Sequence, residues 1–175
     1  MNKFEKVSYE QFEGAEWKSL EHELGEIPSP DYVNVLRDFY DDIKLPKRAT
    51  KGSAGYDFFA PYGFDLEPGE SVKIATGIRV QLDDDKFLAL YPRSGLGFKF
   101  RVQLDNTVGV IDSDYYNSDN EGHIMAKITN DSREGKTVHI KQGEAFMQGV
   151  ITQFFKTDDD DSNAIRNGGF GSTSR

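Results

Sequence analysis

The chain has 175 residues and a mass of 19.7 kDa, which is enough to bury the core of one domain. It has no cysteine, which excludes disulfides and thiolate metal sites, so any bound metal is expected to have oxygen ligands. The formal charge of −9, with no bilayer-length apolar run and no secretory signal, predicts a cytoplasmic protein that binds neither nucleic acid nor membranes.

The first part of the chain, residues 1–42, predicts an acidic helical extension. It has 11 acidic and 4 basic residues and so carries −7 of the total −9. Ser8 and Gln11 form a capping box before an amphipathic helix that Gly14 interrupts, and Ser29-Pro30-Asp31 starts a second helix. The apolar stripe of these helices has to be covered by the main domain, a neighbouring subunit or another protein.

The second part, residues 43–156, predicts an all-β domain. Apolar and polar residues alternate, turn residues separate the runs, and no helical pattern lies between them, which favours an antiparallel sandwich or barrel. The expected strands are 72–82, 87–91, 124–128, 138–140 and 146–155. Residues 157–175, with the acidic run Asp158–Asp161 and a glycine-rich end, predict a flexible C-terminal tail.

Two segments of the β domain differ from ordinary strands and turns. Pro92–Gly97 combines Arg93 and a hydroxyl with two glycines, which suits a phosphate group, although a glycine turn after a strand is the simpler reading. In Gly109–Tyr115 both aspartates are expected on one face of an extended segment. They could hold a metal, act as a general base or close the strand in an Asx turn.

The tail contains a third unusual segment, Gly168–Thr173, with one aromatic side chain between glycines and hydroxyls. A tail that closes over a planar base could stack Phe170 on it, whereas disorder is the alternative for any C-terminus.

Taken in order, these segments resemble the five motifs of the trimeric dUTP pyrophosphatase (dUTPase) family, over roughly residues 43–175. The matching segments are Ala54–Phe58, Pro92–Gly97, Gly109–Tyr115, Gly143–Ile151 and Gly168–Thr173. The resemblance implies a β jelly roll that forms a homotrimer with active sites between subunits. It also implies hydrolysis of dUTP to dUMP and pyrophosphate, which keeps uracil out of DNA and supplies dUMP for dTMP synthesis.

By the same resemblance, the catalytic residues are Asp112, Arg93 and Gln148. Asp112 would be the general base that orients a water for in-line attack on the α-phosphorus, and Arg93 would hold Asp112 and contact phosphate. Gln148 would contact phosphate or the attacking water. The cofactor would be Mg²⁺, which would reach Asp57 through water.

The substrate-binding residues are implied in the same way. Asn106 would pair with uracil, Tyr115 would pack against the deoxyribose and exclude a 2′-hydroxyl, and Ser94 would donate to the phosphates. Phe170 would cover the base. The remaining expected contacts are Gly95, Lys99, Gly109, Val110, Ile111, Arg166, Gly171, Ser172 and Thr173.

The sequence departs from the family pattern at three places. Ile165 stands where the fifth motif usually has its arginine, and Arg166 follows one place later. The link from Tyr116 to Glu121 is longer than usual, which predicts a small surface insertion or a longer hairpin. The extension has no counterpart in the family core and could bind a protein partner. The alternative activity, a dCTP deaminase or bifunctional relative, would need a catalytic glutamate that the third motif lacks.

Overall fold

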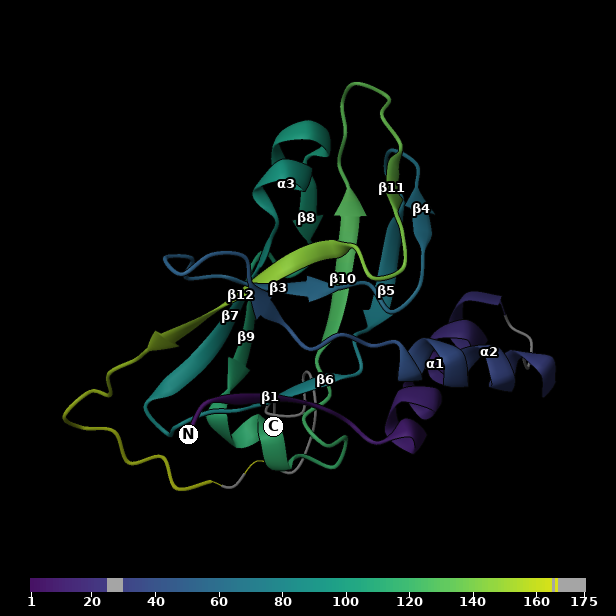
Figure 1. Cartoon of the computed structure of the whole chain (residues 1–175). Helices are drawn as coiled ribbons and strands as arrows, with labels where there is room; N and C mark the ends of the chain where they lie inside the picture. Colours follow the sequence, from purple (N-terminus) through teal and green to yellow (C-terminus); the bar gives the residue numbers. More distant parts are fainter. Residues whose placement is uncertain (25–29, 165, 167–175) are drawn as a thin grey trace.

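The computed structural model describes residues 1–24, 30–164 and 166, and its main body consists of antiparallel strands (Figure 1). The largest sheet has five strands in the order β2-β3-β12-β7-β9. These are β2 (Lys47–Arg48), β3 (Tyr56–Phe59), β12 (Ala145–Gln153), β7 (Lys86–Pro92) and β9 (Gly109–Asp112). Its central strand, β12, is antiparallel to both of its neighbours, β3 and β7, and so joins two segments that lie far apart in the sequence.

Two smaller sheets pack with the large one. One has the order β5-β10-β8, with β5 (Ser71–Ala75), β10 (Met125–Asn130) and β8 (Val102–Leu104), and the other pairs β4 (Phe64–Leu66) with β11 (Val138–Ile140). Inward-facing side chains of all three sheets, such as Phe58, Ile74, Leu88 and Val138, are at most 1% exposed and belong to one hydrophobic core. The alternation in the sequence therefore produces a common core for these sheets.

The expected strand 72–82 is divided in two, which corrects the sequence interpretation. β5 ends at Ala75, and β6 (Ile78–Gln81) belongs to another sheet. Gly77 lies between them with φ of 68°, and a Cβ there would stand 2.2 Å from the Ile43 side chain. Buried apolar residues occur both before and after Gly77, so the alternation of apolar and polar residues runs on without a visible gap. Periodicity alone therefore did not indicate the turn.

The N-terminal segment contributes a strand as well as the two expected helices. β1 (Lys3–Lys6) pairs with β6, and α1 (Tyr9–Leu24) and α2 (Pro30–Asp41) follow. The expected interruption of the first helix is wrong, because α1 continues through Gly14. A Cβ at Gly14 would meet nothing within 4 Å, so the glycine serves no close approach there.

The helices pack on their own domain. Phe12 of α1 and Leu36 of α2 are both 0% exposed and belong to the same core cluster as the strands. Figure 1 shows the two helices side by side at one edge of the β body. The sequence allowed three partners for the apolar stripe of the helices: the main domain, a neighbouring subunit or another protein. Among the described residues, the main domain covers it.

Two short helices interrupt the strand pattern, where the sequence predicted none. They are α3 (Ser94–Phe100) after β7 and the 3₁₀ helix η1 (Ser113–Asn117) after β9. Both lie in segments with candidate site residues. Residues 157–164 run along the surface with exposed side chains. Within the described residues, no helix is long and apolar enough to cross a membrane.

Candidate active site

Part of the candidate site is a row of side chains across three strands. The register of the large sheet pairs Gln148 of β12 with Asp57 of β3 on one side and with Tyr91 of β7 on the other. Paired residues of neighbouring strands point to the same face of a sheet. These three side chains, which are up to 91 positions apart in the sequence, therefore lie beside one another.

Arg93 follows β7 and closes this row. Its Nε lies 3.2 Å from Oδ1 of Asp57, and its Nη1 donates to the carbonyl oxygen of Ala145 at 3.2 Å. The Nε2 of Gln148 donates to the carbonyl oxygen of Pro92 at 3.2 Å. These contacts hold a guanidinium and a carboxamide at the end of β7, where both can donate to an anionic group.

Gly55 makes the approach to Gln148 possible. A Cβ at this position would stand 2.4 Å from Oε1 of Gln148, a separation that two such atoms cannot have. A glycine is therefore favoured at position 55 for a steric reason, because a larger residue would displace the carboxamide of Gln148.

A cavity of about 480 Å³ opens over this row. Its lining comes from Ala49, Ser53, Ala54, Gly55, Asp57, Tyr91, Arg93, Ser94, Gly95, Gln148 and Val150. Ser94 and Gly95 are exposed in the first turn of α3, whose N–H groups have no acceptors within the helix. Lys99 lies exposed in the last turn of α3. We call this cavity the polyphosphate half of the site, after the ligand that the sequence leads us to expect there.

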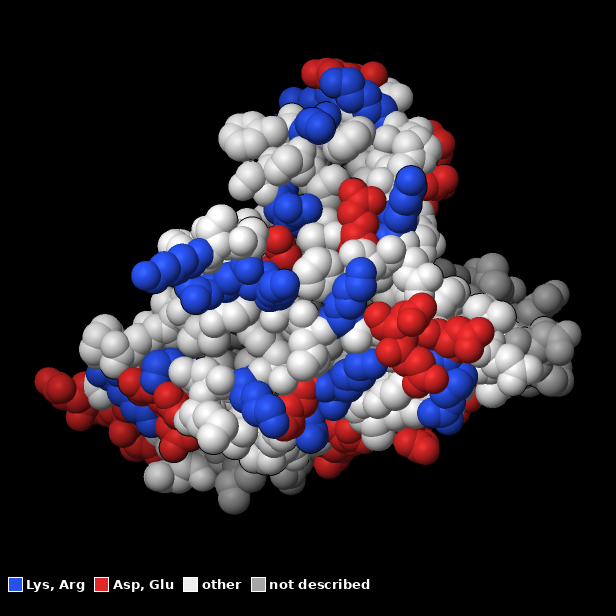
Figure 2. Space-filling model, viewed as in Figure 1, with Lys and Arg blue, Asp and Glu red and all other residues white. Residues whose placement is uncertain are grey.

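The surface around this half is basic although the whole chain is acidic. Lys47, Arg48 and Lys51 lie next to the lining residues Ala49 and Ser53 in the sequence, and all three are exposed. Figure 2 shows Lys and Arg side chains gathered over this part of the body, while acidic side chains form separate groups, chiefly at the lower left and on the right of the view. The local charge therefore suits an anionic ligand better than the net charge of −9 does.

The connection between β8 and β9 shapes a second cavity. It has a volume of about 260 Å³ and a mainly apolar lining, in which Asn106 and Gly109 take part with Leu90 and Met125. Thr107 has φ of 65°, an uncommon conformation for a β-branched residue, and its N–H donates to the carbonyl oxygen of Leu104 at 2.8 Å. Such backbone strain is a feature of ligand-binding turns.

The end of β9 carries the carboxylate pair. Asp112 is the last residue of β9, and Arg166 donates to it from Nη2 at 2.5 Å and to Asp114 from Nε at 2.9 Å. The expectation that both aspartates leave one face of an extended segment is wrong, because Asp114 lies in η1. Val110, Ile111, Asp112, Tyr115 and Arg166 surround a small cavity of about 30 Å³.

Tyr115 is 4% exposed, and burial raises the pKa of its phenol. Its hydroxyl donates to the carbonyl oxygen of His123 at 2.9 Å. The ring is therefore a fixed apolar wall beside Asp112. We call the region from Asn106 to Tyr115 the nucleoside half of the site, again after the ligand that the sequence leads us to expect.

The two halves lie apart within one chain. Asp112 pairs with Phe87 at one end of β7, whereas Arg93 follows Pro92 at the other end. The six steps from Phe87 to Arg93, at about 3.3 Å each, separate Asp112 from Arg93 by about 20 Å along β7. The expected contact between Arg93 and Asp112 is absent from the described residues of a single chain, where Arg93 pairs with Asp57 and Asp112 with Arg166. The physical reason is the antiparallel register of β7 and β9.

The residues present fit a metal that is carried mainly by the substrate. In the described part of the chain, no group of three or more His, Asp or Glu side chains could hold a metal ion. The carboxylate of Asp57 is 21% exposed and lines the polyphosphate half, so it can accept hydrogen bonds from a metal-bound water. Mg²⁺ retains several waters and binds few carboxylates, and this donor set agrees with such a site.

Sequence reasoning missed several residues of the site. Tyr91 and Gly55 line the polyphosphate half, and Asn120 and His123 hold Tyr115. Alternation along β7 could have indicated Tyr91, which stands two residues before Arg93. The expected tail residues Phe170, Gly171, Ser172 and Thr173 lie outside the described residues.

The comparisons with known proteins indicate one family. The sequence model of the dUTPase family matches residues 41–174. Deoxyuridine 5′-triphosphate nucleotidohydrolase of Lactococcus lactis is 42% identical over 134 residues, which cover 75% of this chain and 88% of the relative. The protein of the same name from Hahella chejuensis is 41% identical over 141 residues, covering 76% and 88%.

Solved structures show the same fold. The crystal structure of dUTPase from Streptococcus mutans has a TM-score of 0.58 and 37% identity, and covers 67% of this chain and 91% of that chain. A dUTPase from phage phi11 of S. aureus, with a TM-score of 0.58 and 23% identity over 71% and 92%, contains a structural Mg(II) ion.

An all-β jelly roll that matches the dUTPase sequence model and solved dUTPase structures defines the chain as a nucleotide hydrolase. The chain belongs to the dUTPase family. This membership confirms the resemblance, the fold class and the enzyme class, dUTP diphosphatase.

Proposed function

We propose that this chain hydrolyses dUTP to dUMP and pyrophosphate by in-line attack of a water on the α-phosphorus, with Asp112 as the general base. The reaction keeps uracil out of DNA and supplies dUMP for dTMP synthesis. Asp112 suits this role because it lies at the rim of the nucleoside half beside Tyr115. An ionised carboxylate can accept the proton of the attacking water near neutral pH.

The nucleoside half is assigned to deoxyuridine. Asn106 and the backbone around Gly109 offer donors and acceptors at the edge of the apolar cavity, as a planar pyrimidine requires. Val110 and Ile111 continue this strand toward Asp112. The buried ring of Tyr115 would lie against the sugar, so a 2′-hydroxyl would be rejected by lack of space.

The polyphosphate half is assigned to the triphosphate. Arg93 can contact phosphate oxygens through its fork, and Ser94, Gly95 and Gln148 add neutral donors around the same cavity. Mg²⁺, when bound, would neutralise charge on the phosphates. Asp57 would hold the waters of the metal in place while remaining paired with Arg93.

One substrate would then be bound by two subunits. Arg93 of one half and Asp112 of the other lie about 20 Å apart along β7 in one chain, so a homotrimer with each site between subunits would bring the Arg93 of one chain to the Asp112 of another. Arg166, which now pairs with Asp112 and Asp114, would exchange these carboxylates for phosphate when substrate binds. The tail residues Phe170 to Thr173 would complete the site, with Lys99 of α3 near its edge.

The observation that carries the proposal is the presence of both halves in a member of the dUTPase family. The test measures pyrophosphate release from dUTP, UTP, dCTP and dTTP, with and without Mg²⁺. We expect release from dUTP alone, dependent on Mg²⁺, and a loss of about 10²–10⁴-fold in Asp112→Asn. Asp119→Asn, which removes an exposed carboxylate of the next loop, is the control and retains activity.

Two results would contradict the proposal. Release from dCTP with ammonia would indicate a deaminase of the same fold. Equal activity of Asp112→Asn and Asp119→Asn would remove Asp112 from the reaction.

A further inference from the structure

The loop after Tyr115 is longer than a simple turn and is tightly ordered. The N–H of Ser118 donates to the carbonyl oxygen of Tyr115 at 3.0 Å, and the N–H of His123 donates to that of Asn120 at 3.0 Å. Gly122 has φ of 69°, and a Cβ there would stand 2.7 Å from the Cα of Tyr116. The loop 116–122 therefore folds back closely on the residue at its start.

This loop supplies a hydrogen bond to the phenol of Tyr115. The Nδ2 of Asn120 donates to that oxygen at 2.7 Å, while the phenol donates its single proton to the carbonyl oxygen of His123 at 2.9 Å. Since a carbonyl oxygen can only accept, the direction of both bonds is settled. The two contacts fix the phenol oxygen from two sides.

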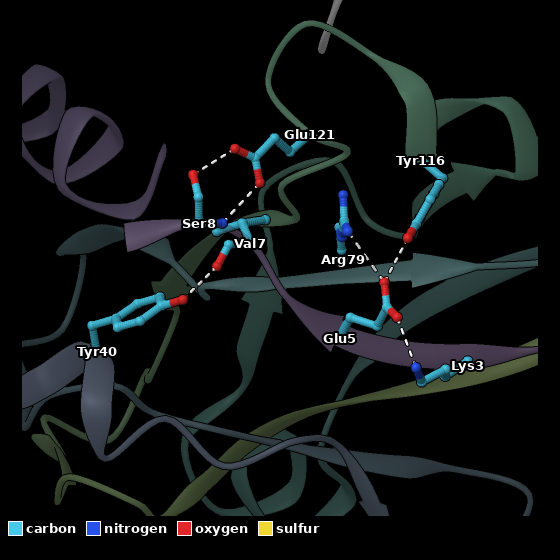
Figure 3. A network of polar contacts seen from close by, with 8 residues as sticks. All are labelled: Lys3, Glu5, Val7, Ser8, Tyr40, Arg79, Tyr116 and Glu121. Carbon is cyan, nitrogen blue, oxygen red and sulfur yellow. Dashed lines mark hydrogen bonds and ion pairs between the residues drawn. The ribbon is translucent and has the colours of Figure 1, made fainter. Parts of the chain in front are cut away.

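The same loop is bonded to the start of α1. Glu121 accepts hydrogen bonds from the N–H of Ser8 at 2.8 Å and from its hydroxyl at 2.5 Å (Figure 3). Burial alone would raise the pKa of Glu121, but these two bonds lower it below the ordinary value. The hydroxyl of Ser8 also accepts from the N–H of Gln11 at 3.1 Å, so Glu121 extends the N-cap of α1.

A second link joins the loop to β1. The hydroxyl of Tyr116 donates to Oε2 of Glu5 at 2.5 Å, and Arg79 donates to the same oxygen at 3.2 Å (Figure 3). The guanidinium of Arg79 lies 4.4 Å from the centre of the Tyr116 ring. Tyr116 is therefore held by side chains of both strands of the β1-β6 sheet, Glu5 of β1 and Arg79 of β6.

His123 forms a third link at the end of the loop. It is 0% exposed, its Nε2 accepts from the N–H of Gly77 at 2.9 Å, and burial lowers its pKa to about 4. The neutral ring consequently carries its proton on Nδ1. The Gln11 side chain of α1 lies against this nitrogen with its Nε2 at 3.4 Å, and the ring can donate to it only when the amide is turned so that its oxygen faces Nδ1. Both β1 and α1 thus contact the loop that holds Tyr115.

We infer that Asn120 and Glu121 are positioning residues, through which the N-terminal segment holds Tyr115 in the place that excludes a 2′-hydroxyl. Asn120 acts directly on the phenol, and Glu121 fixes the loop to Ser8. This inference rests on the proposed function, because the role of Tyr115 toward deoxyribose belongs to it. The N-terminal segment thereby contributes to the preference of the site for deoxyribose, although it contacts no substrate.

The first test compares Asn120→Ala and the shape-conserving Asn120→Asp with Asn117→Ala, which truncates an exposed asparagine of the same region. Losing one hydrogen bond to Tyr115 should lower the preference for dUTP over UTP in kcat/KM by about 5-fold to 10-fold. We expect most of the loss as a higher KM for dUTP and higher activity toward UTP, with kcat changed by less than about 2-fold. A preference unchanged from that of Asn117→Ala overturns the inference.

The second test concerns the link to α1 and needs no activity. Glu121→Gln and Ser8→Ala, with Asp119→Asn as the exposed control, are compared by amide hydrogen exchange in the folded protein. We expect faster exchange at the N–H groups of Ser118 and His123 in both variants and a less than additive effect in the double variant. Exchange equal to the control overturns the link. An unaltered chain that hydrolyses no dUTP refutes the proposed function, whereas an active one with unchanged variants refutes this inference alone.

Discussion

Mixing two inactive variants should restore activity if each site is built from two subunits. Arg93→Ala removes the polyphosphate half of its own chain, and Asp112→Asn removes the nucleoside half. The register of β7 and β9 places these residues about 20 Å apart along β7 in one chain, so a site between subunits can take each intact half from a different chain. We expect that neither variant alone releases pyrophosphate from dUTP and that the mixture does.

The size of the effect follows from random assembly. With equal amounts of both chains, a site has an intact polyphosphate half in about half of cases and an intact nucleoside half in about half, so about a quarter of sites are complete. The chains are co-expressed with different tags, purified through both tags, and assayed for pyrophosphate against the unaltered protein. Selection through both tags removes the homotrimers and raises the fraction to about a third.

A matched control separates complementation from general stabilisation. Asp112→Asn mixed with Tyr115→Ala, two changes in the same half, should stay inactive, because every nucleoside half carries one of them. If the Arg93→Ala and Asp112→Asn mixture is as inactive as this control, the arrangement of sites between subunits is refuted.

Two further predictions concern Gly55 and His123. Gly55→Ala places a Cβ 2.4 Å from Oε1 of Gln148, so kcat/KM for dUTP should fall about 10-fold. The control Gly52→Ala, whose Cβ meets nothing within 4 Å, should leave kcat/KM unchanged. Equal kcat/KM values for the two variants would show that the contact with Gln148 is unimportant. Burial lowers the pKa of His123 from 6.5 to about 4. The stability that the neutral ring contributes to the folded state is therefore complete above pH 6.5 and is lost as the pH falls toward 4. The free energy of unfolding in urea should drop by about 3 kcal/mol over this range and by less in His123→Gln, and an equal drop would exclude His123 as the cause.

The chemistry of the site could be predicted from short stretches of sequence. The segments around Arg93 and Asp112 each contain their functional groups within a few residues, and the resemblance to the family depends on the order of such segments. The all-β class could also be predicted, because alternation and turn residues are local properties of the chain.

The short elements were harder to predict. β1 has four residues, too few to show a period, and α3 and η1 follow strands within glycine-containing or aspartate-containing segments that also suit turns. The break at Gly77 was hidden because apolar residues on both sides of it enter the core.

By itself, the sequence determined the fold class, the family and the residue types that the reaction needs. Only the tertiary structure decided which of these residues meet. Asp57 and Gln148 become neighbours through the register of β3 and β12, and the antiparallel pairing of β7 and β9 separates Arg93 from Asp112. Likewise, Glu121 reaches Ser8 across 113 positions. Strand register and such long-range contacts depend on the packing of the whole core, which no local pattern records.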